Sequence, residues 1–262
     1  MVHALQAGAV VALLAAVMGW FMVLRHQTFA GHTLSVVAFP GASAAALLGL
    51  SASVGYYAAC AGSASLLARA QSGETRSLGG ESAMIGSLQA AVLGLGFLFV
   101  SLSHTVLGGL DALLFGTFLG ITAAQVTTLT LLAGGILVVV AFAARPLLFA
   151  SIDQELARAH GVPVGAVSSG FLVLLGLTVA ATAQITGALL VFALLVTPAA
   201  TALTITARPL ASLALAAGLA LAVTWLGLAI AYFSPYPVGF WVTSLSFAFY
   251  VLVRAIAGRR GE

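Results

Sequence analysis

VTTLTLLAGGILVVVAFAA, residues 126–144, contains no charged side chain and ends directly before Arg145. A helix needs about 20 apolar residues to cross a bilayer core of roughly 30 Å. The stretch has about that length, and basic residues beside a span stay on the cytoplasmic side. It therefore predicts a membrane-spanning helix that ends in the cytoplasm.

Similar apolar segments fill most of the chain on both sides of this stretch. Of the 262 residues, 62% are hydrophobic and only 6% are charged, whereas soluble domains carry roughly 25% charged residues. The sequence thus predicts an all-α, polytopic transmembrane helical bundle that forms a single domain over residues 1–262. We expect about eight or nine spans, and the candidate segments lie near residues 4–24, 33–50, 52–68, 84–102, 126–144, 166–183, 187–206, 210–232 and 238–254.

The nine basic residues are all arginines, and they fall in the gaps between apolar segments. Nine crossings place the N-terminus outside and the C-terminus in the cytoplasm, and they put every arginine on the cytoplasmic side. The arginines are spread singly along the chain, which is not the pattern of a nucleic-acid-binding face. They are Arg25, Arg69, Arg76, Arg145, Arg158, Arg208, Arg254, Arg259 and Arg260.

One predicted external stretch, SHTVLGGLDALLFGTFLGITAAQ at 103–125, differs from the other loops. It is too apolar for a solvated loop and too interrupted by glycine for a span, which favours an interfacial or re-entrant helix. His104 and Asp111 lie on it. They would form an entrance that attracts cations, because clefts lined by one sign of charge concentrate counter-ions. The alternative is that both are ordinary exposed loop residues.

The loop SIDQELARAHGVP at 151–163 carries three charges within six residues. The pattern predicts a short helix with a serine cap, acids in the first turn, basic side chains near the end, a glycine stop and a proline beyond. In that order, these residues are Ser151, Asp153, Glu155, Arg158, His160, Gly161 and Pro163. The segment is either a solvated loop helix or a coupling helix that docks into a partner's groove.

Three stretches resemble signatures of the ATP-binding-cassette (ABC) permeases for zinc and manganese uptake. DQELARAHGV at 153–162 resembles the family loop D-x-E-L-A-R-A-x-G-V. FAGHTLS at 29–35, with FPG at 39–41, resembles the signature F-x-G-[D/H]-A-L-S-H…G of the second span. GALLVFALLVTPAATA at 187–202 resembles G-x-L-L-V-x-A-L-L-[VI]-x-P-A-A-T-A, and LFG at 114–116 matches a family L-F-G. These matches are in the family's order and extend over nearly the whole chain.

This resemblance implies a homodimer in the bacterial plasma membrane, with a translocation path at its two-fold axis. Two copies of a separate cytoplasmic ATPase would bind at the coupling helices, and an extracytoplasmic solute-binding protein would deliver the metal ion. The sequence has no G-x-x-x-x-G-K-[ST] loop, so ATP hydrolysis is expected from the partner and not from this chain. No permanently bound cofactor is expected. The expected coupling residues are Asp153, Glu155, Ala157, Arg158, His160 and Gly161.

The resemblance also implies a metal ligand at His32. Family members often carry a second histidine four residues later, one helical turn away, but this chain has Val36 there. Two copies of His32 across the dimer axis, with Ser35 and water, would complete a loose site, which suits a transporter because its ligands must also release the ion. The alternative for His32 is an interfacial histidine bonded to a nearby carbonyl.

Gln184, Thr197 and Pro198 are expected to line the path. A proline within a span frees a carbonyl that a cavity or a neighbour must satisfy, so Pro198 predicts a kink; the alternative is a packing kink without a ligand role. The single cysteine, Cys60, is expected to serve in close helix packing.

Other classes fit the sequence less well. An intramembrane metalloprotease needs a motif such as H-E-x-x-H, which does not occur. A secondary transporter usually places ionisable groups at mid-membrane, and Asp111 is the one acid outside the predicted cytoplasmic loops. A permease for a metal chelate stays the main alternative. The choice between zinc, manganese and iron is open, because nitrogen ligands favour zinc, oxygen ligands favour manganese, and one histidine does not decide.

Overall fold

The computed structural model describes residues 2–71, 80–102, 114, 116 and 120–258. Within these ranges the regular secondary structure is helical, and no strand occurs. The helices are α1 (Val2–Leu24), α2 (Thr28–Leu47), α3 (Ala52–Gln71), α4 (Gly80–Leu102), α6 (Ala123–Ile152), α7 (Gln154–Ala159), α8 (Val164–Thr186), α9 (Ala188–Ile205), α10 (Pro209–Tyr232) and α11 (Val238–Gly258).

Each of the nine predicted apolar segments coincides with one of the long helices, which confirms the all-α expectation. Within the described ranges, six helices are long and apolar enough to cross a membrane, namely α1, α2, α6, α8, α10 and α11. The apolar parts of α4 and α9 are shorter, at Gln89–Leu102 and Leu190–Ile205. The number of crossings and the orientation of the termini stay predictions.

Helix α6 is longer than its hydropathy predicts. It begins at a capping box, in which the Thr122 hydroxyl accepts from the Gln125 backbone N–H and the Gln125 side chain accepts from the Thr122 backbone N–H. It then continues through Pro146 to Ile152, for 30 residues. At 1.5 Å per residue its length is about 45 Å, more than the roughly 30 Å hydrocarbon core. Residues 123–125, expected in the external stretch, therefore open this helix.

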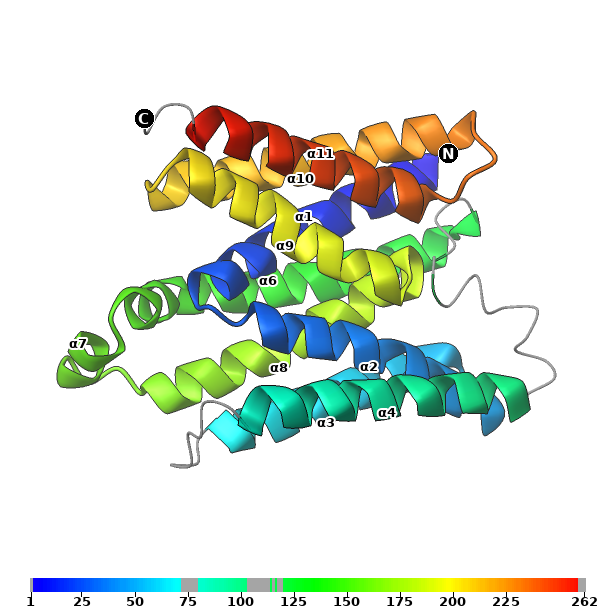
Figure 1. Ribbon diagram of the computed structural model, residues 1–262, viewed down its shortest axis with the longest axis horizontal. Helices are drawn as coiled ribbons and strands as arrows, with labels where there is room; N and C mark the ends of the chain where they lie inside the picture. Colours follow the sequence, from blue (N-terminus) through cyan, green and yellow to red (C-terminus); the bar gives the residue numbers. More distant parts are fainter. Residues whose placement is uncertain (1, 72–79, 103–113, 115, 117–119, 259–262) are drawn as a thin grey trace.

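The helices lie roughly side by side, and α7 projects from one end of the bundle (Figure 1). The C-terminal ends of α1, α3, α9 and α11 lie at that same end, whereas α1 starts at the opposite end (Figure 1). Arg25, Arg69, Arg208 and Arg254, which end or follow these helices, therefore lie toward this end of the bundle. Helix α1 is apolar on all sides and packs against α6, α9 and α10, which makes it the centre of the core.

Small residues bring helices α2 and α3 into backbone contact. A Cβ atom at Gly55 would lie 2.1 Å from the Gly41 carbonyl oxygen, and one at Gly41 would lie 2.6 Å from the Gly55 carbonyl oxygen. Such close approach is how helices pack in lipid, where apolar burial gives little driving force. Cys60 lies in the same layer, fully buried, with its thiol 3.6 Å from the Leu34 carbonyl oxygen. The packing role expected for the cysteine is confirmed.

A buried polar pair joins the central helix to α10. The Trp20 indole N–H donates to the Ser212 hydroxyl at 2.9 Å, and that hydroxyl donates to the Pro209 carbonyl at 3.0 Å. Buried Trp N–H groups need such a partner. The pair fixes the rotation of α1 against α10, which purely apolar faces would leave loosely specified.

Candidate functional site

The residues singled out by sequence fall into several regions, and the first is α7 at the projecting end. Its N-cap is Asp153, whose Oδ1 accepts from the Leu156 backbone N–H at 2.9 Å. The expectation that Ser151 caps this helix is wrong. Ser151 still belongs to α6, where its hydroxyl donates to the Leu147 carbonyl, and Asp153 lies at the break between the two helices.

The C-terminal end of α7 follows the prediction. Gly161 adopts φ +78°, the left-handed conformation that glycine adopts most readily. Its backbone N–H donates to the Arg158 carbonyl at 3.0 Å, and the Val162 N–H donates to the Ala157 carbonyl at 3.0 Å. The His160 ring also lies 2.9 Å from the Leu156 carbonyl through Nδ1. These bonds satisfy carbonyls that a helix end leaves open, so α7 is a closed turn and not a frayed loop.

Helix α7 has one buried residue, and its other residues are exposed. Ala157 is fully buried against Ala150 and Val164, so a larger side chain would lift the helix. The exposed set includes both signs of charge and one large apolar side chain, Leu156, at 46% exposure. The exposed residues are Gln154, Glu155, Leu156, Arg158, Ala159, His160 and Gly161. This mixed surface lies at the tip of the molecule (Figure 1).

The second region is inside the bundle, at His32. Its ring meets the Phe192 ring edge-on, with 4.8 Å between centroids. Each residue lies in the second turn of its helix, and α2 and α9 run in opposite directions (Figure 1). The contact therefore places His32 between α2 and α9. Its Nδ1 is buried without a hydrogen-bond partner among the described residues, so the carbonyl partner of the alternative interpretation is not found at this nitrogen.

The other residues proposed around His32 have local roles. Ser35 is buried, and its hydroxyl donates to the Gly31 carbonyl at 3.0 Å. Val36 lies one turn after His32 on the same helix face. His104 and Asp111 lie outside the described residues. Within the described ranges, no three histidine, cysteine or acidic side chains come together as a metal site, so one chain alone does not supply a complete set of such ligands there.

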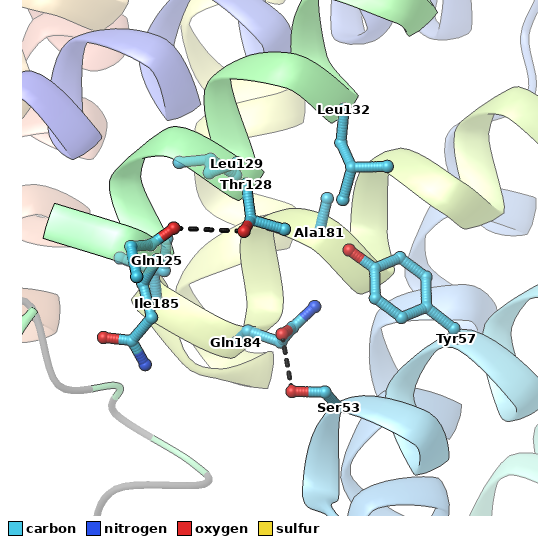
Figure 2. A pocket seen from close by; sticks show the side chains of 10 residues that line it. Ser53, Tyr57, Gln125, Thr128, Leu129, Leu132, Ala181, Gln184 and Ile185 are labelled. Carbon is cyan, nitrogen blue, oxygen red and sulfur yellow. Dashed lines mark hydrogen bonds between the residues drawn. The ribbon is translucent and has the colours of Figure 1, made fainter. Parts of the chain in front are cut away.

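Gln184 is part of a cavity of about 250 Å³ between α3, α6 and α8. Its Oε1 accepts from the Ser53 hydroxyl at 2.8 Å, and Tyr57 and Thr128 lie beside it in the wall (Figure 2). The cavity lies at the end of the bundle opposite α7, because α3 and α6 begin there and α8 ends there (Figure 1). The sequence does not single out Ser53, Tyr57 and Thr128, since mostly apolar helices do not reveal which faces meet.

Thr197 and Pro198 lie within α9, where the chain remains helical through the proline. Pro198 is buried, and the Thr197 carbonyl accepts from the Thr201 hydroxyl at 2.7 Å. One turn earlier, the Leu195 carbonyl faces α1 so closely that a Cβ at Gly19 would lie 1.9 Å from its oxygen. This part of α9 is thus a tight crossing with the central helix.

Leu114 and Gly116, from the L-F-G stretch, lie against the junction between α8 and α9. Both Gly116 and Gly187 have positive φ, at +77° and +78°. A Cβ at Gly116 would lie 2.7 Å from the Gly187 nitrogen, and one at Gly187 would lie 2.2 Å from the Leu114 carbonyl oxygen. Two sequence signatures far apart in the chain therefore meet backbone to backbone.

This architecture and these contacts extend over nearly the whole chain, and so does the match to one family. The profile described as "ABC 3 transport family" matches residues 1–257. The chain belongs to the ABC 3 transport family. Together with the apolar helices, membership identifies it as a multi-pass membrane protein of the bacterial plasma membrane.

Relatives within this family carry the names of metal transport proteins. The manganese transport system membrane protein MntC of Halalkalibacterium halodurans is 31% identical over 215 residues, which cover 82% of this chain and 73% of that protein. The high-affinity zinc uptake system membrane protein ZnuB of Haemophilus influenzae is 30% identical over 203 residues, covering 76% and 75%. The solved structure of PsaBC from Streptococcus pneumoniae in complex with Fab contains a chain with TM-score 0.83 and 27% identity, covering 95% of this chain and 89% of that one.

Proposed function

We propose that this family member is the membrane-spanning subunit of an ATP-driven importer for divalent metal ions, manganese or zinc, with residues 1–262 forming one permease domain. The observation that carries the proposal is the family match over residues 1–257, together with relatives named for manganese and zinc transport. The same match agrees with the three signatures found in the sequence.

The cargo path is proposed to pass His32 at the interface of two copies of the chain. A buried ring nitrogen without a partner is a free ligand position, and buried polar groups of this kind need an explanation in a native structure. One imidazole binds a divalent ion weakly, so a second copy of His32 and water would complete the coordination. An incomplete shell is compatible with passage, because a path must release its ion.

The ATPase is proposed to dock on α7. This helix has both its ends closed by hydrogen bonds and presents Glu155, Arg158 and Leu156 to solvent at the tip of the bundle. The side of the bundle that bears the arginines would face the cytoplasm, where the ATPase is found. An extracytoplasmic solute-binding protein would then deliver the ion to the opposite end.

Transport is tested by reconstituting the chain in vesicles with its ATPase and binding protein and supplying radioactive manganese or zinc. ATP-dependent accumulation of either ion supports the proposal, and the ratio of the two uptake rates gives the preference. Complexes that assemble and hydrolyse ATP without accumulating either ion would overturn it.

A chelate is the second candidate cargo. The chelated iron transport system membrane protein YfeD of Yersinia pestis is 28% identical over 201 residues, covering 76% of this chain. The vesicle assay separates the two cargo classes when radioactive iron is supplied free and as a chelate. Uptake of the chelate alone would favour this alternative.

The docking role of α7 is tested by the double substitution Glu155→Ala and Arg158→Ala. We expect the ATPase to stop co-purifying with the variant, because both exposed charges would be lost from the docking surface. Arg254→Ala is the matched control, since Arg254 is exposed near the same end of the bundle but belongs to α11. Normal co-purification of the ATPase with the double variant would remove α7 from the interface.

A further inference from the structure

Arg25 differs from the other arginines of the described ranges because it is only partly exposed. It directly follows α1, and its guanidinium reaches two other helices. One terminal nitrogen donates to the Ser168 hydroxyl of α8 at 2.5 Å, and the other lies 3.5 Å from the Ser151 hydroxyl of α6. The central guanidinium carbon, Cζ, also lies 5.4 Å from the centre of the Phe171 ring, within the range of a cation–π contact.

This cation is held without a carboxylate among its described contacts. Two hydroxyls and one ring surround the guanidinium, and its Nε is buried without a hydrogen-bond partner. Burial lowers the pKa of Arg25 from its ordinary value, but an arginine keeps its charge in proteins. Burying a charged group without an ion-pair partner is costly. Its position therefore calls for a role beyond solubility or membrane orientation.

The two serines stand on either side of α7. Ser151 precedes the cap Asp153 by two residues, and Ser168 lies in the second turn of α8, after α7 has ended. Arg25 thus contacts both ends of the segment that carries α7. Phe171, one turn further along α8, adds a third contact on the same side.

On its other side Arg25 is tied to α2 by a short turn. His26 has φ +55°, the Gln27 N–H donates to the Met22 carbonyl at 2.9 Å, and the Gly31 N–H donates to the Gln27 carbonyl at 3.1 Å. His32 follows Gly31 directly. Only this hydrogen-bonded turn and the first turn of α2 separate the guanidinium from the candidate metal residue.

We propose that Arg25 is a positioning residue that clamps the α6–α7–α8 segment to the start of α2, so that a movement of α7 is passed to His32. Its significance for transport rests on the proposed function, whereas the clamp itself is a property of the chain alone. A clamp of hydroxyls and a ring is weaker than a buried ion pair, and it joins the elements while allowing them to shift.

The clamp is tested first on the full chain in nanodiscs, by spin-label distance measurement between Ala159→Cys on α7 and Leu48→Cys at the far end of α2. Leu48 is 75% exposed, and the native Cys60 is fully buried and stays unlabelled. Labelled chain is diluted with unlabelled chain so that distances between copies do not contribute. Arg25→Met should broaden the distance distribution by several ångströms, and Arg25→Lys should restore part of its sharpness.

The double variant Ser151→Ala and Ser168→Ala keeps the arginine and removes both hydroxyl partners. It should broaden the distribution as Arg25→Met does, and it decides the question if Arg25→Met fails to fold. Distributions that superimpose on the wild type in the folded variants would overturn the clamp.

The consequence for transport is measured on the reconstituted complex, as ions accumulated per ATP hydrolysed. Arg25→Met should lower this ratio at least threefold while the ATPase still co-purifies, and Arg25→Lys should recover part of it. An unchanged ratio would overturn the transmission role. Failure of the wild-type complex to transport metal would instead refute the proposed function. The distance measurement would still test the clamp, because it uses the chain alone.

Discussion

Replacing Gly161 by alanine tests whether the turn that closes α7 is needed for ATPase binding. Gly161 has φ +78°, and a Cβ built there meets no atom within 4 Å. The substitution therefore adds backbone strain without a steric clash. In the left-handed region a side chain costs about 1–2 kcal/mol. The open space at the Cβ position lets the free variant relax, and docking must then restore the strained conformation.

The affinity for the ATPase should accordingly fall by up to about five- to thirtyfold, at 1.36 kcal/mol per factor of ten. Titration of the purified chain in nanodiscs with labelled ATPase measures this change. Gly161→Asn should lose less affinity, because asparagine tolerates the left-handed region better than other side chains.

Gly49 provides the matched control. It has φ +74° and an equally empty Cβ position, but it lies between α2 and α3, at the end of the bundle opposite α7. Gly49→Ala should carry the same local strain and leave the ATPase affinity unchanged. Equal affinities for the wild type and both alanine variants would refute the reasoning, because the geometry of the α7 turn would then not matter to the partner.

Three further changes test the core and the path. His32→Ala should lower metal uptake by about tenfold or more, as loss of support at a metal site commonly does, while complex assembly stays normal; uptake at the wild-type rate removes His32 from the path. Gly55→Ala should destabilise the fold by about 1–3 kcal/mol through overpacking. Gly62→Ala on the same helix has open space at its Cβ and should stabilise the fold by about 0.5–1 kcal/mol. Thermal unfolding in detergent compares the two variants, and equal shifts in unfolding temperature contradict the α2–α3 contact. Trp20→Phe should cost about 1 kcal/mol by removing the bond to Ser212, and an unchanged unfolding temperature would show that this bond does not stabilise the fold.

Hydropathy predicted the helices well because a helix that crosses a bilayer needs a minimum apolar length, and this length can be counted in the sequence. It placed the end of the α6 segment at residue 144, whereas the helix continues to Ile152. The extension past Pro146 depends on packing against other helices, which the local pattern does not contain. The same extension explains the misplaced cap, since Ser151 and Asp153 are both good cap residues and only the end of α6 decides between them.

The rotation of each helix about its own axis could not be predicted from the sequence. Gln184 was expected to line the path, but its cavity partners Ser53, Tyr57 and Thr128 were not foreseen. Arg25 was expected only as a cytoplasmic marker, although its contacts with Ser151 and Ser168 span more than 120 residues of sequence. Such partners are set by tertiary packing, and a helix that is apolar all round gives no periodic signal for them.

The contact between Gly116 and Gly187 limits how the chain can vary during evolution. Each residue occupies a conformation that side chains rarely adopt, and a Cβ at either one would strike the backbone beside the other. A substitution at one position cannot be compensated by a substitution at the second, because both have to remain without a side chain. The two glycines should therefore persist together wherever this junction is kept, and a lineage that loses one should also have rebuilt the connection between α8 and α9.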